Sequence, residues 1–335
     1  MKKYSINLCT LIIAFTIISC KDDPVKLSLS DFPTDTIMVE NENLLDSFKI
    51  INVFRYKDYV IGIVPHSSFG KYPYVLYNSG DLTYNGVVGQ FGRSYKEFTE
   101  VNPYYIIKND TSFIQCTDGY FESSCVITEG NLNILWKNKL SSFNMNNLCR
   151  IDSNRFCFLN EDIKNEFILY SSTTKDYSKF SNFPDDYFPC KEYDEYLGFY
   201  DKTTSYNDSD SLLYSFYANI PMLRIYDNNG IEQSSFIIET NIDNSQFYQD
   251  YINECDKEYY SMAKSTGKYI FALYHGESFS IPYSEIHVWG NRGKLIKRII
   301  LNKWIKCFDI DIDAHKVYGI YVDEDEHLFS ASFYI

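Results

Sequence analysis

The sequence predicts an all-β fold, a six-bladed β-propeller whose last blade is closed by an N-terminal strand, and three observations lead to this prediction. Short runs of β-branched and aromatic residues recur six times along the chain. Tight turns that contain glycine follow four of these runs. Aromatic residues make up 18% of the chain, with 31 Tyr and 25 Phe, and this bias favours strands over a helical bundle.

The six runs begin at intervals of 43 to 57 residues. A propeller blade of four strands has a period of roughly 40–50 residues, so each run marks one blade. A β-sandwich or two smaller β domains would also explain the strands, but neither explains the sixfold recurrence. The runs occupy residues 59–64, 112–116, 155–159, 212–217, 269–274 and 317–321.

The turns and the chain ends complete the predicted blades. Glycine and asparagine suit hairpin turns because such turns need positive φ, which a Cβ disfavours. We expect these turns between the third and outermost strands, at 78–81, 128–131, 227–230 and 290–293. The chain ends at Ile335, directly after a strand-like run, and leaves the last blade one strand short. Residues 36–40 are predicted to supply that strand and to remove the open edge.

The N-terminus predicts export and lipidation. Lys2 and Lys3 precede an apolar stretch at 8–18, which is too short to span a bilayer. The segment 17–20, Ile-Ile-Ser-Cys, resembles a lipobox, which implies a signal peptide over 1–19 and a diacylglycerol on Cys20. A tether over 20–34 and a propeller over 35–335 would follow. An ordinary cleaved signal peptide or a signal anchor is the alternative.

The likeness to lipoproteins also suggests a location. Residues 21–23, Lys-Asp-Asp, resemble the surface-export signal of Bacteroidetes lipoproteins. We therefore expect anchoring to the outer membrane through the lipid at Cys20, on the cell surface or the periplasmic face.

Charge and cysteine content exclude some classes of protein. The formal net charge of −14 becomes −16 once the two lysines of the signal peptide are removed. Such acidity argues against nucleic-acid binding, which depends on Lys and Arg at phosphates. Seven cysteines remain after Cys9 and Cys20, without a C-x-x-C pair. The pairs Cys116–Cys125 and Cys149–Cys157 are close enough to be hairpin partners, but the spacing does not establish either bridge.

No catalytic motif is present in the sequence. Its five histidines form no H-E-x-x-H pattern, and the chain has no G-x-S-x-G or P-loop motif. The alternating Asp-Ile segment at 309–313 resembles a calcium loop but lacks its glycine and late glutamate. We expect that segment to be a solvated strand edge, and we expect neither a metal nor a cofactor.

Long loops predict a binding face on one side of the propeller. Loops at 65–71, 89–103, 117–123, 181–190, 239–257 and 275–284 are longer than the tight turns of the opposite face. Long loops on a rigid scaffold concentrate binding residues, and aromatic side chains suit contact surfaces. The same aromatic residues could instead cap the core. The predicted ligand-binding residues are His66, Phe91, Arg93, Tyr120, His275, Phe279 and Tyr283.

A ten-residue motif carries a family resemblance. Gly89, Gly92, Glu97 and Phe98 match a G-x-x-G-x-G-P-G-E-F stretch, whereas 94–96, Ser-Tyr-Lys, replaces its Gly-Pro-Gly. With this motif and the strand pattern over 36–335, the chain resembles the TolB-like, NHL-type six-bladed propeller lipoproteins of the Bacteroidetes. The resemblance implies a lipid-anchored propeller.

Two functions remain open at this point. The first is a non-enzymatic binding or scaffold module for a protein, peptide or glycan on the long-loop face. The alternative is a glycan-active hydrolase or lyase with its site at the propeller channel. Fold alone does not separate them. Convergence of two carboxylates and a histidine at the long-loop end of the channel would favour the enzyme.

Overall fold

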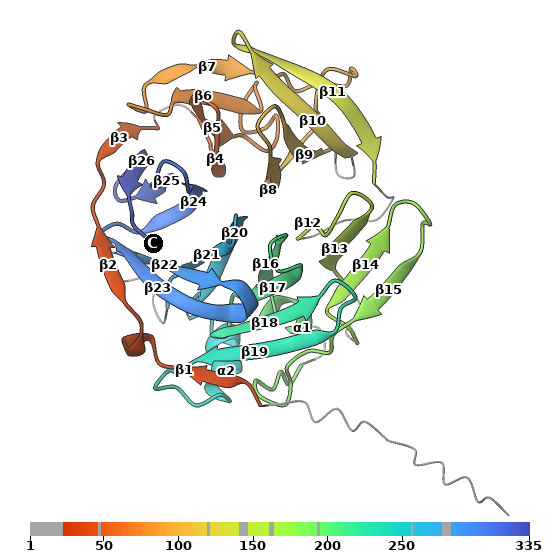
Figure 1. Cartoon of the computed structure of the whole chain (residues 1–335), viewed down its shortest axis with the longest axis vertical. Helices are drawn as coiled ribbons and strands as arrows, with labels where there is room; N and C mark the ends of the chain where they lie inside the picture. The colour runs from red at the N-terminus through yellow and green to blue at the C-terminus, as the bar shows by residue number, and fades with distance from the viewer. Residues whose placement is uncertain are drawn as a thin grey trace, which may run out of the picture.

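The computed structural model shows six β-sheets arranged in a ring, which confirms the predicted propeller (Figure 1). It describes residues 23–45, 48–118, 121–140, 147–160, 164–192, 195–255, 257–276 and 283–335. Within each blade the strands follow the chain from the centre of the ring outward.

Each blade has four strands of the main repeat, except that the last blade takes its outermost strand from the N-terminus. Blade 1 contains β4 (Asn52–Tyr56), β5 (Tyr59–Ile63), β6 (Tyr74–Asn78) and β7 (Tyr84–Val88). Blade 2 contains β8 (Val101–Lys108), β9 (Phe113–Thr117), β10 (Phe121–Thr128) and β11 (Asn131–Lys139). Blade 3 contains β12 (Cys149–Arg150), β13 (Arg155–Leu159), β14 (Phe167–Ser171) and β15 (Tyr177–Phe180).

The second half of the ring is built in the same way. Blade 4 contains β16 (Lys202–Asn207), β17 (Leu212–Tyr217), β18 (Met222–Asp227) and β19 (Glu232–Ile238). Blade 5 contains β20 (Tyr260–Thr266), β21 (Tyr269–Tyr274), β22 (Ser284–Gly290) and β23 (Lys294–Leu301). Blade 6 contains β24 (Ile305–Asp311), β25 (Lys316–Val322) and β26 (Glu326–Ser332). Two short helices, α1 (Tyr196–Phe199) and α2 (Gln246–Ile252), lie in the connections that enter blades 4 and 5.

The six apolar runs of the sequence all form the second strand of a blade, namely β5, β9, β13, β17, β21 and β25. These strands are buried along almost their whole length. A second strand has neighbours on both sides within its own sheet and sheets packed against both of its faces. Its sequence is therefore rich in apolar residues, and polar members such as Gln115 and Ser215 are buried as well, whereas the outer strand β11 alternates between exposed and half-buried residues.

Closure of the ring by the N-terminus is confirmed, but with a different strand. The closing strand is β3 (Asn41–Leu44), which pairs antiparallel with β26. The predicted segment 36–40 overlaps β2 (Thr34–Ile37), which pairs parallel with β23 as a fifth strand of blade 5. Strand propensity marks a segment as extended but does not select its partner. In this chain the outer edges of blades 5 and 6 are both available.

A third N-terminal strand precedes these two. β1 (Val25–Leu27) lies within the segment expected as a tether, and it pairs parallel with β19 on the outside of blade 4. A 3-10 turn, η1 (Leu29–Asp31), follows it. Figure 1 shows this N-terminal segment, in red and orange, running along the outside of the teal and blue blades. The segment therefore covers the outer edges of blades 4, 5 and 6.

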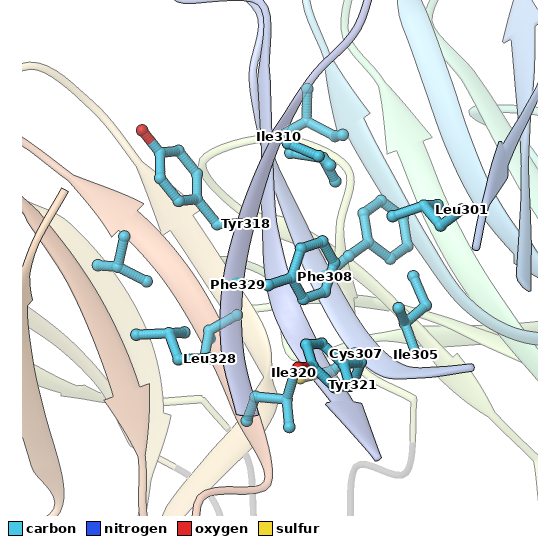
Figure 2. Close-up of a cluster of buried hydrophobic side chains, with 14 of the residues drawn as sticks. Leu301, Ile305, Cys307, Phe308, Ile310, Tyr318, Ile320, Tyr321, Leu328 and Phe329 are labelled. Carbon is cyan, nitrogen blue, oxygen red and sulfur yellow. The ribbon is translucent and has the colours of Figure 1, made fainter. Parts of the chain in front are cut away.

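The largest apolar core cluster extends across the closure. It contains buried residues of blades 5, 6 and 1 and of the closing segment, including Leu301, Phe308 and Val60. Figure 2 shows its centre, where side chains from all three strands of blade 6 pack together. Burial of one such Leu or Phe side chain stabilises a fold by about 1.5–3 kcal/mol. The seam between the chain ends is thus among the well-packed parts of the ring.

Three of the four expected hairpin turns have glycine at positive φ, at Gly130, Gly230 and Gly293. In the turn after β6, Leu82 rather than Gly80 takes the left-handed conformation, with φ 59°. The Leu82 side chain is fully buried in the core, and this burial offsets the backbone strain. All seven cysteines of the described chain are free, including Cys149 and Cys157, which face each other across β12 and β13.

Candidate functional site in the central channel

The central channel contains a cavity of about 1210 Å³. All six inner strands line it, with the second half of each strand and the turn that follows. Those turns join first and second strands, so the cavity lies toward the face with short turns. The lining ranges are 54–57, 104–110, 148–153, 204–206, 263–267 and 309–313, together with Asp208 and Ser209.

Asp309 is the buried centre of a charged group in this cavity. It lies on β24, the inner strand of blade 6, and only 3% of its surface is exposed. Its Oδ2 accepts a hydrogen bond of 2.5 Å from Lys108 Nζ in blade 2 and one of 2.6 Å from the backbone N–H of Arg55 in blade 1. Nε of Arg55 also lies 3.6 Å from Oδ2 of Asp311. Asp309 therefore ties three blades together at the channel wall.

This position corrects the expectation of a solvated strand edge at 309–313. The alternation does place Asp309 and Asp311 on one side of the strand, as expected. The strand is the inner edge of its sheet, however, so that side faces neighbouring blades and the channel. Only ring closure determines which edge of a blade faces the centre.

Lys264 and Tyr104 are the other prominent side chains of the cavity. Lys264, on β20, is half-buried and makes no hydrogen bond or ion pair with a described residue. Burial lowers the pKa of its ammonium group, nearby Asp309 opposes that shift, and Lys108 adds to it. Tyr104, on β8, leaves 61% of its surface exposed although protein surrounds it, because the channel admits water. An exposed ring and an amine thus both line the cavity.

A second group lies at the opposite end of the inner strands. Asp201 directly precedes β16, Glu258 lies two residues before β20, and His275 follows β21. Backbone hydrogen bonds link them through Ala218 and Tyr259: Ala218 N–H donates to Asp201, Tyr259 N–H to Ala218, and His275 N–H to Tyr259. Two carboxylates and a histidine therefore come together at the long-loop end, as the enzyme alternative requires.

The contacts of His275 limit the chemistry of this group. Its Nε2 lies 2.9 Å from Ser261 Oγ and 3.7 Å from Glu258 Oε2. In a Ser-His-acid triad the hydroxyl and the carboxylate meet different nitrogens of the ring. Here both meet the same nitrogen, so Ser261 is not arranged as a triad nucleophile.

Burial shifts the pKa values in this group in opposite directions. Burial, and then the nearby Asp201 carboxylate, raises the pKa of Glu258 to about 7. Burial lowers the pKa of His275 to about 4, so its imidazole is neutral at pH 7. Among the residues that the structure describes, no group of three His, Cys, Asp or Glu side chains could hold a metal ion.

The predicted long-loop residues do not form one site. His66, Phe91 and Arg93 lie in the loops of blade 1, where His66 and Arg93 are exposed and Phe91 packs against the core. His275 and Tyr283 flank a loop of blade 5, and blade 6 separates them from blade 1. None of these five lines the cavity. Tyr120 and Phe279 lie outside the described residues.

The glycine motif at 89–98 has a structural explanation. Phe91 and Phe98 form a β-bridge, and Glu97 Oε2 accepts a hydrogen bond of 2.9 Å from the Ser94 N–H. A Cβ on Gly92 would lie 2.0 Å from that carboxylate. Phe98 itself is fully buried. The matched residues thus shape this loop and anchor it to the core.

A buried ionic cluster joins blades 3 and 4 near the long-loop face. Glu166 Oε1 accepts hydrogen bonds from Lys202 Nζ at 2.5 Å and Tyr217 OH at 2.6 Å. Its Oε2 accepts them from Arg224 at 2.6 Å and Ser181 at 2.8 Å. Burial would raise the pKa of Glu166, but Lys202 and Arg224 keep it below its usual value. Both carboxylate oxygens have partners, and none of these side chains lines the cavity, so the cluster is structural.

Sequence reasoning missed Lys108, Lys264, Tyr104, Asp201 and Glu258. A signal for the first two was present, because each apolar run marks a second strand and the inner strand precedes it through a tight turn. Lys108 and Lys264 stand four and five residues before the runs at 112 and 269. The remaining three had no comparable sequence signal.

Comparison with known proteins supports the fold. No protein-family model matches the chain, and no curated protein matches it. A solved structure from the DUF4221 family of Bacteroides vulgatus is similar with a TM-score of 0.60 and 13% identity, over 89% of this chain and 97% of that one. A Bacteroides fragilis protein described as exported is similar with a TM-score of 0.50 and 11% identity, over 93% of this chain and all of that one.

At these identities the two structures establish a shared propeller fold and nothing further. The TolB-like and NHL-type assignment stays a prediction. No helix in the described part of the chain is both long and apolar enough to cross a membrane. Cys20 lies outside the described residues.

Proposed function

We propose that this protein is an exported lipoprotein, anchored to the outer membrane at Cys20, whose propeller is a non-enzymatic module that binds a glycan in its central channel. The cavity of about 1210 Å³ carries this proposal. Pockets for small ligands usually enclose about 300–1,000 Å³, so this one can take a short oligosaccharide. Its walls are the inner strands and the short turns that follow them, and a rigid wall loses little entropy on binding.

The chemistry of the wall supports a glycan rather than an apolar ligand. Carboxylate, hydroxyl and ammonium groups from all six blades line the cavity. A sugar presents hydroxyl groups on every side, and such groups need donors and acceptors of this kind once they leave water. Tyr104 adds an exposed ring that combines an apolar face with a polar tip, as a sugar ring requires.

The ligand location is tested with a matched pair of exposed residues, one on each face. Purified protein is screened against labelled oligosaccharides, and affinities of the hits are measured by calorimetry. Tyr104→Ala in the channel is expected to weaken binding by about tenfold or more, from the loss of about 1.5 kcal/mol of ring contact. Arg93→Ala on the long-loop face should leave affinity unchanged. The reverse result would move the site to the long-loop face, where a protein, peptide or glycan was first expected.

The anchor has its own test. Cys20→Ala should abolish labelling by a radioactive or clickable fatty acid and release the protein from the membrane fraction. A mutant that remains labelled and membrane-bound would overturn the lipoprotein proposal. Binding by the propeller is independent of this outcome.

A glycan-active hydrolase is a second candidate, favoured by Asp201 and Glu258. A carboxyl with a pKa near 7 can donate a proton at neutral pH while a neighbouring carboxylate stays ionised. Glu258→Gln should then abolish release of reducing sugar but retain binding. If the unmutated protein releases no sugar from any glycan that it binds, the non-enzymatic function stands.

A further inference from the structure

The ammonium group of Lys264 is the unusual charge of the channel. It lies in the cavity wall of an acidic protein, yet no described residue pairs with it by an ion pair or hydrogen bond. Two other cationic groups of the cavity have carboxylate partners: Lys108 binds Asp309, and Arg150 lies 3.3 Å from Glu122. A half-buried charge without a counter-ion is unfavourable, and a ligand can supply the missing charge.

The surroundings of Lys264 leave a net positive charge at this point. Among the acidic groups, Asp309 has the largest electrostatic effect on Lys264. Its Oδ2 already accepts hydrogen bonds from Lys108 Nζ at 2.5 Å and from the backbone N–H of Arg55. Two lysines therefore share one buried carboxylate. The lowered pKa of Lys264 agrees with this arrangement, since burial and Lys108 both disfavour its charged form.

The rest of the cavity restricts the anion that fits. Asp152, Asp208 and Asp311 also line it and would repel a ligand with several negative charges. A single carboxylate on an otherwise neutral sugar meets Lys264 without bringing more charge to those aspartates. A phosphate ester suits the site less well because it carries more charge, whereas a sulfate ester carries one charge, as the carboxylate does, and is distinguished from it by experiment.

We infer that Lys264, with Lys108 beside it, forms a subsite for the carboxylate of a uronic acid unit in the channel. This inference rests on the proposed function, because it names the class of glycan that the channel takes. The Lys264 ammonium donates a charge-assisted hydrogen bond to the carboxylate. Such a hydrogen bond is roughly twice as strong as one between neutral groups. Tyr104 then faces the sugar chain from blade 2, and the hydroxyl groups meet the polar wall.

The test compares acidic sugars with their neutral methyl esters. Full-length protein in detergent is titrated by calorimetry with two tetrasaccharides of neutral hexoses, one that carries a single galacturonate unit and one that carries a single glucuronate unit, each as free acid and methyl ester. The free acid is expected to bind about tenfold or more tightly than the ester, as one charged hydrogen bond predicts. Lys264→Met should remove this preference, so that the acid and the ester bind with equal affinity.

Lys57→Met is the matched control. Lys57 lines the mouth of the same cavity, but it is exposed and lies over the Tyr56 ring at 5.0 Å. Solvent screens its charge, so its removal should keep the preference for the acid.

The outcomes separate the two proposals. Equal binding of acid and ester, or a preference that survives Lys264→Met, overturns the carboxylate subsite and leaves glycan binding in place. Preferential binding of an oligosaccharide of neutral sugars that carries one sulfate ester, over both uronates, also overturns it. Binding of none of these sugars, in a screen that finds no other glycan ligand, overturns the proposed function as well.

Discussion

Removal of the buried charge at Glu166 should destabilise the propeller strongly. Glu166→Gln preserves the size of the side chain but keeps one acceptor oxygen in place of two, so that oxygen can accept from Tyr217 while the amide N–H donates to Ser181 Oγ. The substitution leaves Lys202 without its carboxylate partner, although its Nζ still lies 4.7–5.2 Å from the centres of three aromatic rings. Arg224 keeps a second partner, Glu232. Lys202 is therefore the charge that loses its compensation.

The expected loss is about 3 kcal/mol of unfolding free energy, the lower end of the range for a broken buried ion pair. Urea unfolding at pH 7, followed by tryptophan fluorescence, measures it. Glu232→Gln removes a carboxylate that is partly exposed and should lose about 1 kcal/mol or less. A double variant, Glu166→Gln with Lys202→Met, should recover part of the loss, because no uncompensated charge remains.

The pH dependence provides a further check. The folded pKa of Glu166 is lowered, so its contribution is present above the unfolded pKa and is lost as pH falls through the folded pKa. The difference between wild type and Glu166→Gln should shrink in acid. The assignment of Lys202 as the uncompensated charge would be refuted if Glu166→Gln lost no more unfolding free energy at pH 7 than Glu232→Gln. It would also be refuted if the double variant were less stable than Glu166→Gln.

Three other perturbations test the fold. Gly293→Ala should lower the free energy of unfolding by about 2–4 kcal/mol, measured with urea, because the new Cβ would lie 2.4 Å from Ile225 at positive φ. The Cβ of Gly267→Ala meets open space, so this control should lose about 1 kcal/mol. Equal losses would contradict the steric argument. Deletion of 23–45 should prevent cooperative unfolding, because blade 6 loses β3. Deletion of 23–28 removes only β1 and should lower the melting temperature by a few degrees. A larger loss from the shorter deletion would refute closure by β3. The pKa of His275 is lowered to about 4, so its contribution to stability is lost as pH falls from 6.5 through 4. The stability advantage of wild type over His275→Gln should therefore fall by about 3 kcal/mol between pH 7 and pH 4. A constant difference would show that the pKa of His275 is the same in the folded and unfolded states.

The sequence by itself was sufficient to predict the number of blades. Six second strands are mostly apolar because protein covers them on every side, and this pattern can be recognised without knowledge of the partner strands. Glycine at positive φ likewise reflects local backbone geometry, so Gly130, Gly230 and Gly293 were predicted correctly. The acidity that predicts no binding of nucleic acid is also a property of composition alone.

The strand partners of the N-terminal segment could not be predicted from local sequence. Its strand propensity predicted closure, but β1 and β2 pair with blades 4 and 5, more than 200 residues away along the chain. An extended segment can pair with any free edge of suitable register. Which edge it takes depends on the ring that the other blades have already formed.

The candidate site depended wholly on the tertiary structure. Lys108 and Asp309 meet across 201 residues, and Lys264 joins them from a third blade. Each is an unremarkable charged residue near a turn in the sequence, where a solvated position is the usual outcome. The closed ring turns the inner edge of every blade toward one axis, so side chains that would be solvated on an isolated sheet line a common cavity. The charge, burial and pairing of those groups therefore follow from ring closure, which no local pattern in the chain records.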